Sequence, residues 1–423
     1  MQKTDKMNLD FEYSSKAKTV SFVLIGIGLL ALAYGIFTED GTHGTRLWSN
    51  IYLNSFFFFG ISLASLFFLT LQYAAQAAWG TVLKRVFEAF TTFIPVGSIF
   101  LVIVFLAGTL HYHHIFHWMD TEVYYPFISE SGELIKEYQA GASENPHYDA
   151  ILDGKSAYLN QPFFWIRTLT YLAIFIFFAR LFRKRSLEED LVGGNEYFFK
   201  NVQLAAIFLV LFAITSSTLA WDWLMSIDPH WFSTLYGWYA FSGYWASAMI
   251  AIVLMTIFLK SQGYLEFVNE NHVHDMGKWM FATNFLWCYL YFSQYELIWY
   301  SNIPEEVTYF LSRIENYKGL MIGVFAINLV LPLFGLMSRD SKRSYTTLAV
   351  IGSILFITHW LDFLLMIFPG AVNDKFTGVG FLEIGMFLGF LGLFLFVVFN
   401  SLTKAPLLVK NHPYLEESKH HHI

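Results

Sequence analysis

The chain has 423 residues, of which 56% are hydrophobic, 20% aromatic and only 14% charged, and its formal net charge is −7. Soluble domains carry about 25% charged residues, so this composition excludes an ordinary soluble protein of this size. The chain has a single cysteine, Cys288. It therefore cannot by itself hold a disulfide framework, an iron–sulfur cluster or a covalently attached c-type haem.

Ten apolar runs are long enough to cross a bilayer, because a spanning helix needs about 20 mostly apolar residues. The sequence therefore predicts an all-α, polytopic integral membrane protein with about ten transmembrane helices arranged as bundles. We treat 1–423 as a single membrane domain with one long outer loop at 111–160. The predicted helices cover residues 19–37, 50–77, 86–110, 161–182, 201–222, 235–260, 277–301, 317–337, 345–368 and 379–400.

Lysine and arginine predict the orientation. With the N-terminus inside, nineteen of the 26 basic residues fall on inner segments and seven on outer ones. The positive-inside rule then places both termini in the cytoplasm, which requires an even number of helices. The outer loop carries a local charge near −6 between Asp120 and Asn160. It is either a solvated loop that helps to set the orientation or a docking surface for a partner subunit.

Ionisable residues within the predicted helices concentrate near the outer face. A charged side chain in a membrane helix commonly costs about 2.5–3.5 kcal/mol, so each one needs a reason. The lopsided distribution predicts a buried polar pocket near the outer face. The residues that we expect to handle quinol or protons there are His114, His117, Arg167, Asp222, Glu296, His359 and Asp362.

Two pairs among these residues have positions that favour a direct interaction between the two side chains. His359 and Asp362 are three residues apart and so share one helix face. Such a pair can hold one imidazole tautomer and relay a proton, or it can be a structural contact between helices. Arg167 and Asp222 are predicted to lie in the same outer layer, where a pair between them would lower the cost of burying either charge.

The segment from His111 to Trp118 contains four histidines. The spacing of His113, His114 and His117 could ligate a metal if a carboxylate joined them. It is equally typical of a polar, protonatable site or of a helix end at the headgroup layer, and we predict no metal site. A b-type haem is not favoured either, because only His359 lies clearly within a predicted helix. The histidines of the C-terminal tail, 420–422, are left out of any metal argument.

A family resemblance rests on the run from Trp221 to Thr234, which begins Trp-Asp-Trp and contains an Asp-Pro turn, together with the His111–Trp118 segment. With these motifs the chain resembles the ActF membrane subunits of bacterial alternative complex III, which are related to the NrfD/PsrC family. The resemblance extends over most of the chain in the number of helices and in the long loop after the third.

The resemblance implies a place in a quinol:cytochrome c oxidoreductase of the bacterial inner membrane. The expected partners are a multihaem cytochrome c, an iron–sulfur subunit, a second NrfD-like subunit and lipids, with no nucleic acid. The expected ligand is quinol or quinone. This subunit would supply a quinol-type pocket, a proton pathway near the outer face, or both.

Two other functions remain open. Acidic and histidine side chains within the membrane also suit a proton-coupled secondary transporter, although transporters usually place such groups near the midplane. The chain could also be a non-catalytic scaffold whose acidic loop docks partner subunits. No Walker motif, GxGxxG fingerprint or nucleophile elbow occurs in a fitting context, so the sequence does not support a soluble-type enzyme mechanism.

Overall fold

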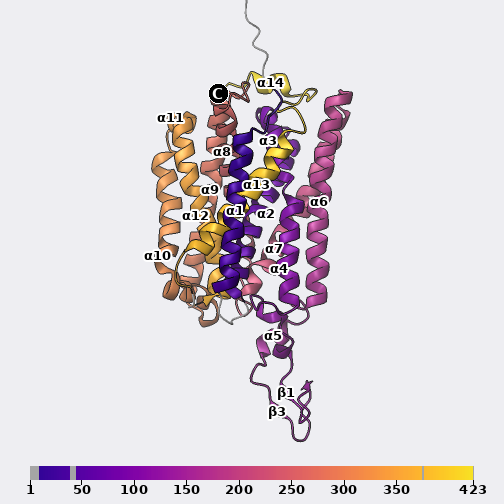
Figure 1. Cartoon of the computed structure of the whole chain (residues 1–423), viewed down its shortest axis with the longest axis vertical. Helices are drawn as coiled ribbons and strands as arrows, with labels where there is room; N and C mark the ends of the chain where they lie inside the picture. The colour runs from indigo at the N-terminus through magenta and orange to yellow at the C-terminus, as the bar shows by residue number, and fades with distance from the viewer. Residues whose placement is uncertain (1–8, 39–43, 374–375, 423) are drawn as a thin grey trace, which may run out of the picture.

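A computed structural model of the chain describes residues 9–38, 44–373 and 376–422. It is a bundle of long, roughly parallel helices with a small extension at one end (Figure 1). The long helices are α1 (Ser15–Thr38), α2 (Thr45–Ala74), α4 (Ile94–Thr109), α6 (Gln161–Val192), α7 (Glu196–Trp223), α8 (Leu235–Ser261), α9 (Glu270–Ser301), α10 (Pro304–Gly335), α12 (Tyr345–Ala371) and α13 (Phe381–Leu402). The all-α membrane fold predicted from the sequence is confirmed.

Short elements connect these helices. They are the α-helices α3 (Lys84–Thr91), α5 (Ala150–Lys155), α11 (Arg339–Arg343) and α14 (Leu415–Lys419), and the 3-10 turns η1 (Trp79–Leu83), η2 (His117–Met119), η3 (Thr121–Tyr124) and η4 (Met225–Ile227). Three two-residue strands in the outer loop, β1 (Phe127–Ile128), β2 (Leu134–Ile135) and β3 (Ser143–Glu144), form an antiparallel sheet in the order β2-β1-β3.

Within the described residues, nine helical stretches are long and apolar enough to cross a membrane. The predicted span at 277–301 is not among them. It belongs to α9, a 32-residue helix whose mixture of polar and aromatic residues lowers its hydropathy. α9 nevertheless begins beside the C-terminal tail, where Asn269 donates to the carbonyl of His421, and runs to the opposite end of the bundle (Figure 1). It therefore traverses the bundle with the nine apolar stretches.

Several predicted boundaries differ from the structure. The predicted helix 86–110 is two helices, α3 and α4, which are separated at Thr92 and Phe93. α6 continues to Val192, ten residues beyond its predicted end, because its last turns are charged and extend past the apolar span. α10 starts at Pro304, and its backbone is non-helical at Tyr317, the residue at which the predicted span begins.

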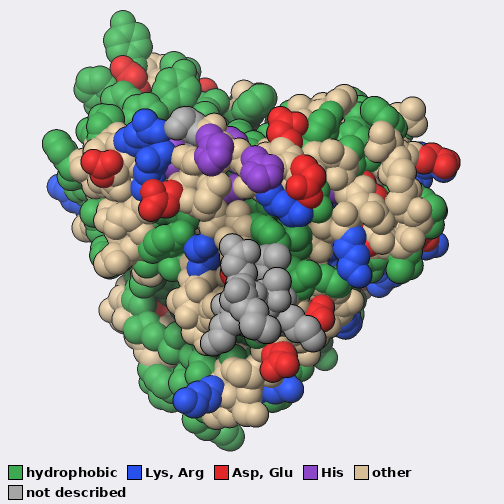
Figure 2. All heavy atoms as spheres, turned by 90° about the horizontal axis from the view of Figure 1, so that it is seen from above, with side chains coloured by type: hydrophobic (Ala, Val, Ile, Leu, Met, Phe, Trp, Pro, Cys, Tyr) green, Lys and Arg blue, Asp and Glu red, His purple; other side chains and the backbone are tan. Residues whose placement is uncertain are grey.

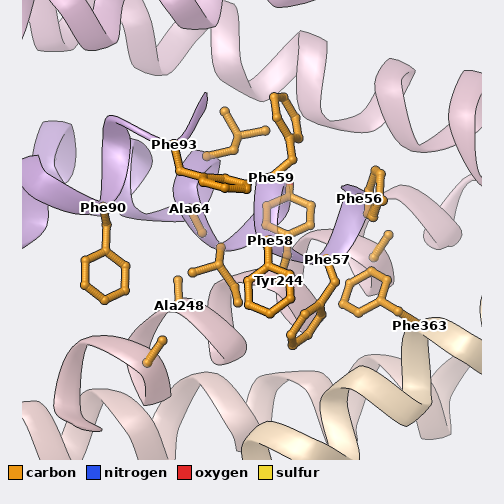
Figure 3. Close-up of a cluster of buried hydrophobic side chains, with 14 of the residues drawn as sticks. Phe56, Phe57, Phe58, Phe59, Ala64, Phe90, Phe93, Tyr244, Ala248 and Phe363 are labelled. Atoms are coloured by element: carbon orange, nitrogen blue, oxygen red, sulfur yellow. The ribbon is translucent and has the colours of Figure 1, made fainter. Parts of the chain in front are cut away.

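Two groups of helices pack around α2. One contains α4, α6 and α7, and the other contains α8, α9, α10 and α12. α2 is buried almost along its whole length, so its consecutive phenylalanines at 56–59 all contact other helices (Figure 3). α1 and α13 form a separate pair on the outside of the bundle.

The described chain begins and ends at the same end of the bundle, because the amide of Leu407 donates to the carbonyl of Leu9. Figure 2 looks onto this end, where basic, acidic and histidine side chains gather. The loop at 111–160, with α5 and the small sheet, projects from the opposite end (Figure 1). We call these the terminal end and the loop end.

Candidate functional site

Asp362 lies at the centre of the group formed by α8, α9 and α12 and is fully buried. Tyr239 of α8 donates its hydroxyl to Oδ1, and Trp287 of α9 donates its indole N–H to Oδ2 at 2.8 Å. No ion pair between described residues includes Asp362, although most of the other buried carboxylates have a basic partner. About nine residues separate it from the end of α12, which corresponds to a depth of roughly 14 Å. Asp362 is thus a buried acid held by two neutral donors.

His359, one turn away on α12, is also fully buried. Its Nε2 lies 2.9 Å from Oδ1 of Asn284 on α9, and its Nδ1 has no hydrogen-bond partner within the described chain. The ring of Trp287 packs edge-on against the imidazole, with centroids 5.3 Å apart. His359 and Asp362 therefore share a helix face, as predicted, but they do not bond to each other directly. Trp287 contacts both.

A row of polar groups continues from His359 towards the middle of the bundle. Asn284 donates to the carbonyl of Asn328 on α10 at 2.5 Å, and Thr358 donates to Oδ1 of Asn328 at 3.1 Å. These hydrogen bonds lie inside an apolar setting, where they favour a defined arrangement of α9, α10 and α12.

In the other direction, tyrosines lead from Asp362 to the loop end. Tyr239 packs against Tyr236, with ring centroids 5.8 Å apart, and Tyr236 packs against Tyr309 of α10 at 6.0 Å. The guanidinium of Arg313 lies 3.3 Å from the centre of the Tyr309 ring. The tyrosines are joined by ring contacts, and the buried hydroxyl of Tyr236 has no hydrogen-bond partner among the described residues, so it is free to donate to or accept from a neighbouring group.

Arg313 ends this row beside the Asp-Pro turn. It is buried, and its Nη2 donates to Oδ2 of Asp228 at 3.1 Å. It also donates to the carbonyls of Tyr309 and Leu365, at 2.8 and 3.1 Å. The Asp228–Arg313 pair therefore links the turn after α7 to α10 and α12. We use the name polar row for the series of residues that leads from the Asp-Pro turn into the bundle. Its members, in order, are Asp228, Arg313, Tyr309, Tyr236, Tyr239, Asp362, Trp287, His359, Asn284, Asn328 and Thr358.

Arg167 and Asp222 form the pair that the sequence predicted. The guanidinium of Arg167 on α6 contacts both carboxylate oxygens of Asp222 on α7, at 2.8 and 2.9 Å. Tyr171 donates a further hydrogen bond to Oδ2 at 2.9 Å, and the rings of Tyr158 and Phe163 lie about 4 Å from the guanidinium. Every charge in this cluster has a partner, so its contacts point to a structural link between α6 and α7.

His114 and His117 lie elsewhere. Both direct Nδ1 towards Asp120, at 2.9 and 3.4 Å, and neither contacts Asp222 or Arg167. Hydrogen bonding to Asp120 raises the pKa of His117 above its ordinary value. Partial burial acts to raise the pKa of Asp120, but hydrogen bonds from His117 and His114 hold it below its usual range. This cluster is exposed at the loop end and separate from the polar row.

Glu296 is exposed on α9, and no hydrogen bond or ion pair among the described residues joins it to the other predicted site residues. Glu383, another acid near the loop end, does have polar partners. It contacts Arg46 at 2.8 and 3.1 Å and accepts a hydrogen bond from Asn50 at 3.1 Å. The seven predicted site residues thus lie in four separate places: the cluster around Asp120, the Arg167–Asp222 pair, the polar row and the exposed position of Glu296.

Buried charges are not confined to the loop end, contrary to the distribution that the sequence suggested. At the terminal end, Arg85 contacts Glu88 at 2.6 Å and also contacts Asp190. Lys84 lies 3.0 Å from Glu189, and Arg183 lies 2.8 Å from Glu88. Spacing alone did not reveal this network, because it forms where the charged last turns of α6 lie beside α3.

Two apolar grooves flank the α1–α13 pair. One, of about 440 Å³, lies towards α8 and α12, and its only polar lining side chains are Ser21 and Ser353. The other, of about 370 Å³, lies towards α2 and α4, and only the indole of Trp48 offers it a side-chain polar group. None of the predicted site residues lines either groove. Their chemistry fits lipid acyl chains better than a polar ligand headgroup.

No protein-family model matches the sequence, and no curated protein matches it at a significant level. The chain is therefore placed by its architecture, as a multi-pass membrane protein of helical bundles with a buried polar row that runs inward from the loop end.

Proposed function

We propose that this chain is a membrane subunit of a quinol:cytochrome c oxidoreductase complex and that its polar row carries protons between the bundle interior and the loop end. The observation that carries the proposal is the environment of Asp362. It is a fully buried acid with two neutral donors and no ion-pair partner in the described chain. An acid without a counter-charge is a group whose protonation state can change without breaking a salt bridge.

The direction of the polar row supports a role on the outer side. It reaches the loop end through Tyr239, Tyr309 and the Asp228–Arg313 pair, and it ends inward at Asn328. Quinol oxidation releases protons that must leave on one side of the membrane. By the charge distribution of the sequence, the loop end is the outer side.

Of the two roles implied by the family resemblance, the contacts favour the proton pathway over a quinol pocket. A quinol headgroup needs hydrogen-bond partners, and the two large grooves offer almost none. In this proposal electrons pass through haem and iron–sulfur subunits, because the chain has only one cysteine, which is buried. Inner-membrane location with cytoplasmic termini belongs to the same proposal.

A proton-coupled transporter is the second candidate. It is favoured by the interruption of α10 at Tyr317 and by the prolines within α10 and α12, Pro332 and Pro369, because transporters often use broken helices near their binding sites.

Mild-detergent purification of the tagged native complex distinguishes these functions. The proposal predicts that a multihaem cytochrome c, an iron–sulfur protein and a second polytopic subunit copurify with the chain and that the preparation oxidises quinol. A chain that purifies alone, and that drives proton-dependent solute uptake in liposomes, would instead be a transporter. A complex whose quinol oxidation survives the loss of Asp362 would make the chain a scaffold.

A further inference from the structure

Three histidines surround one carboxylate just beyond the loop end of α4. The helix stops at Thr109, and His111 takes a left-handed backbone conformation with φ of 60°, which turns the chain back on itself. His114 follows in the turn, and His117 begins η2, which leads directly to Asp120. The three histidines are spaced by three residues, but they meet through this turn and not along a helix face.

The donor atoms converge closely. Nδ1 of His114 lies 2.9 and 3.1 Å from the two oxygens of Asp120. Nδ1 of His111 lies 3.2 Å from Oδ1, and Nδ1 of His117 lies 3.4 Å from Oδ2. Candidate ligand atoms of His111, His114 and Asp120 all fall within 4.8 Å of one another. Two imidazole nitrogens and one carboxylate thus converge, while His117 approaches the carboxylate from the side of its other oxygen.

We propose that His111, His114 and Asp120 form a binding site for a divalent transition-metal ion of the zinc class, with His117 beside the second oxygen of Asp120. Zinc binds imidazole at about 2.0–2.1 Å in tetrahedral geometry, so neighbouring ligand atoms lie about 3.4 Å apart. The distances from the histidines to Asp120, 2.9–3.4 Å, are close to this separation. Imidazole nitrogen with carboxylate oxygen is a donor set that zinc, cobalt, nickel and copper share, and that magnesium and calcium do not prefer.

The surroundings allow an ion to reach the site. The three histidine side chains are 40–54% exposed, whereas Asp120 is only 19% exposed and is anchored at its amide by the carbonyl of His117. His113 does not belong to the site, because it is buried and its Nε2 bonds to the carbonyl of Val104 at 2.9 Å. A bound ion would connect the end of α4 to the start of the outer loop. This inference is independent of the proposed function.

Cobalt and zinc titration of the purified full-length chain tests the site. The chain is prepared without a polyhistidine tag, in a background where His420 and His422 of the tail are replaced by alanine. One Co²⁺ per chain, with the intense visible absorption of a tetrahedral nitrogen–oxygen site, is expected, and one equivalent of Zn²⁺ should displace it. His114→Ala and Asp120→Asn should each weaken Co²⁺ binding by about tenfold or more.

His147→Ala is the matched control, because His147 is an exposed histidine of the same loop that faces Glu122 at 4.0 Å. It should leave binding unchanged. Asp120→Asn changes only one oxygen to an amide, so a monodisperse variant with native circular dichroism reports on the site itself. Absence of stoichiometric binding, or equal affinity in Asp120→Asn and the parent, would show that the cluster is only a hydrogen-bonded turn and would overturn the proposal.

Discussion

Trp287 donates its indole N–H to Oδ2 of Asp362 at 2.8 Å, while the ring packs edge-on against His359. Trp287→Phe should keep the aromatic contact and remove the hydrogen bond. A hydrogen bond to a charged group contributes about 1.5–3 kcal/mol, so we expect quinol:acceptor turnover to fall about tenfold. Steady-state turnover of the purified complex measures this.

The control for that substitution lies on the same helix. Trp299 of α9 is 66% exposed, and Trp299→Phe should leave turnover within about twofold of the parent. Equal effects of the two substitutions would mean that the hydrogen bond to Asp362 has no part in turnover.

The Arg167–Asp222 pair should contribute to stability and not to turnover chemistry. Removing one partner leaves a buried charge unpaired, which costs about 3–5 kcal/mol. Arg167→Gln and Asp222→Asn should therefore each lower the thermal unfolding midpoint. The double variant should lose less than the sum of the two single losses, because it leaves no unpaired charge. Asp153→Asn is a suitable comparison, because Asp153 pairs with Lys136 at 3.6 Å on the exposed loop and should cost at most about 1 kcal/mol. Additive single and double effects would contradict the account.

Two glycines of α1 give a matched test of helix packing. A Cβ at Gly28 would lie 2.4 Å from the backbone of Gly389 on α13, whereas a Cβ at Gly26 would meet nothing within 4 Å. Gly28→Ala should destabilise the α1–α13 pair by about 1–3 kcal/mol, and Gly26→Ala should be neutral or slightly stabilising. Thermal unfolding of the two variants in the same detergent measures the difference, and equal midpoints would argue against direct backbone contact.

The C-terminal tail should dock in a pH-dependent manner. His412 packs against Tyr73, Phe198 and Tyr414, and burial lowers its pKa from 6.5 to about 2. The unfolded state therefore binds the proton more readily than the folded state. Stability is fully present above pH 6.5 and is lost as the pH falls below it, by at most about 1.4 kcal/mol per pH unit.

His412→Phe removes this proton uptake and keeps a ring in the site. Between pH 7.5 and 5.0 its unfolding midpoint should fall less than that of the parent, whereas His422→Ala, at an exposed position, should follow the parent. Identical slopes for His412→Phe and the parent would contradict a neutral, buried His412.

Much of the fold could be predicted from the sequence, because lipid-spanning helices must satisfy their backbone hydrogen bonds internally and therefore appear as apolar runs. The Arg167–Asp222 pair could also be predicted, because the predicted topology placed both charges in the same outer layer of the membrane. The break between α3 and α4 also had a signal, Pro95 in the first turn of α4, which the predicted helix 86–110 did not take into account. The hydropathy of α9 is lower than that of the nine apolar stretches, because α9 presents polar side chains to its neighbours in the bundle.

The polar row could be predicted only in part. His359 and Asp362 were found by their spacing, but the donors that hold Asp362 come from α8 and α9, and one sequence does not show which helices are neighbours. The repeats Tyr236-x-x-Tyr239 and Asn284-x-x-Trp287 were the available signals, because each places two polar side chains on one helix face. The histidine cluster was assessed as part of a helix, although the helix ends before it.

The most direct test of a proton-carrying row is quinol:acceptor turnover in a complex that carries Asp362→Asn. Asparagine preserves size and keeps one oxygen that can accept from Trp287, but it cannot exchange a proton, so turnover should fall about a hundredfold while the partner subunits remain bound. Asp153→Asn, on the exposed loop, should retain parental turnover. Full turnover in an intact Asp362→Asn complex would contradict the account.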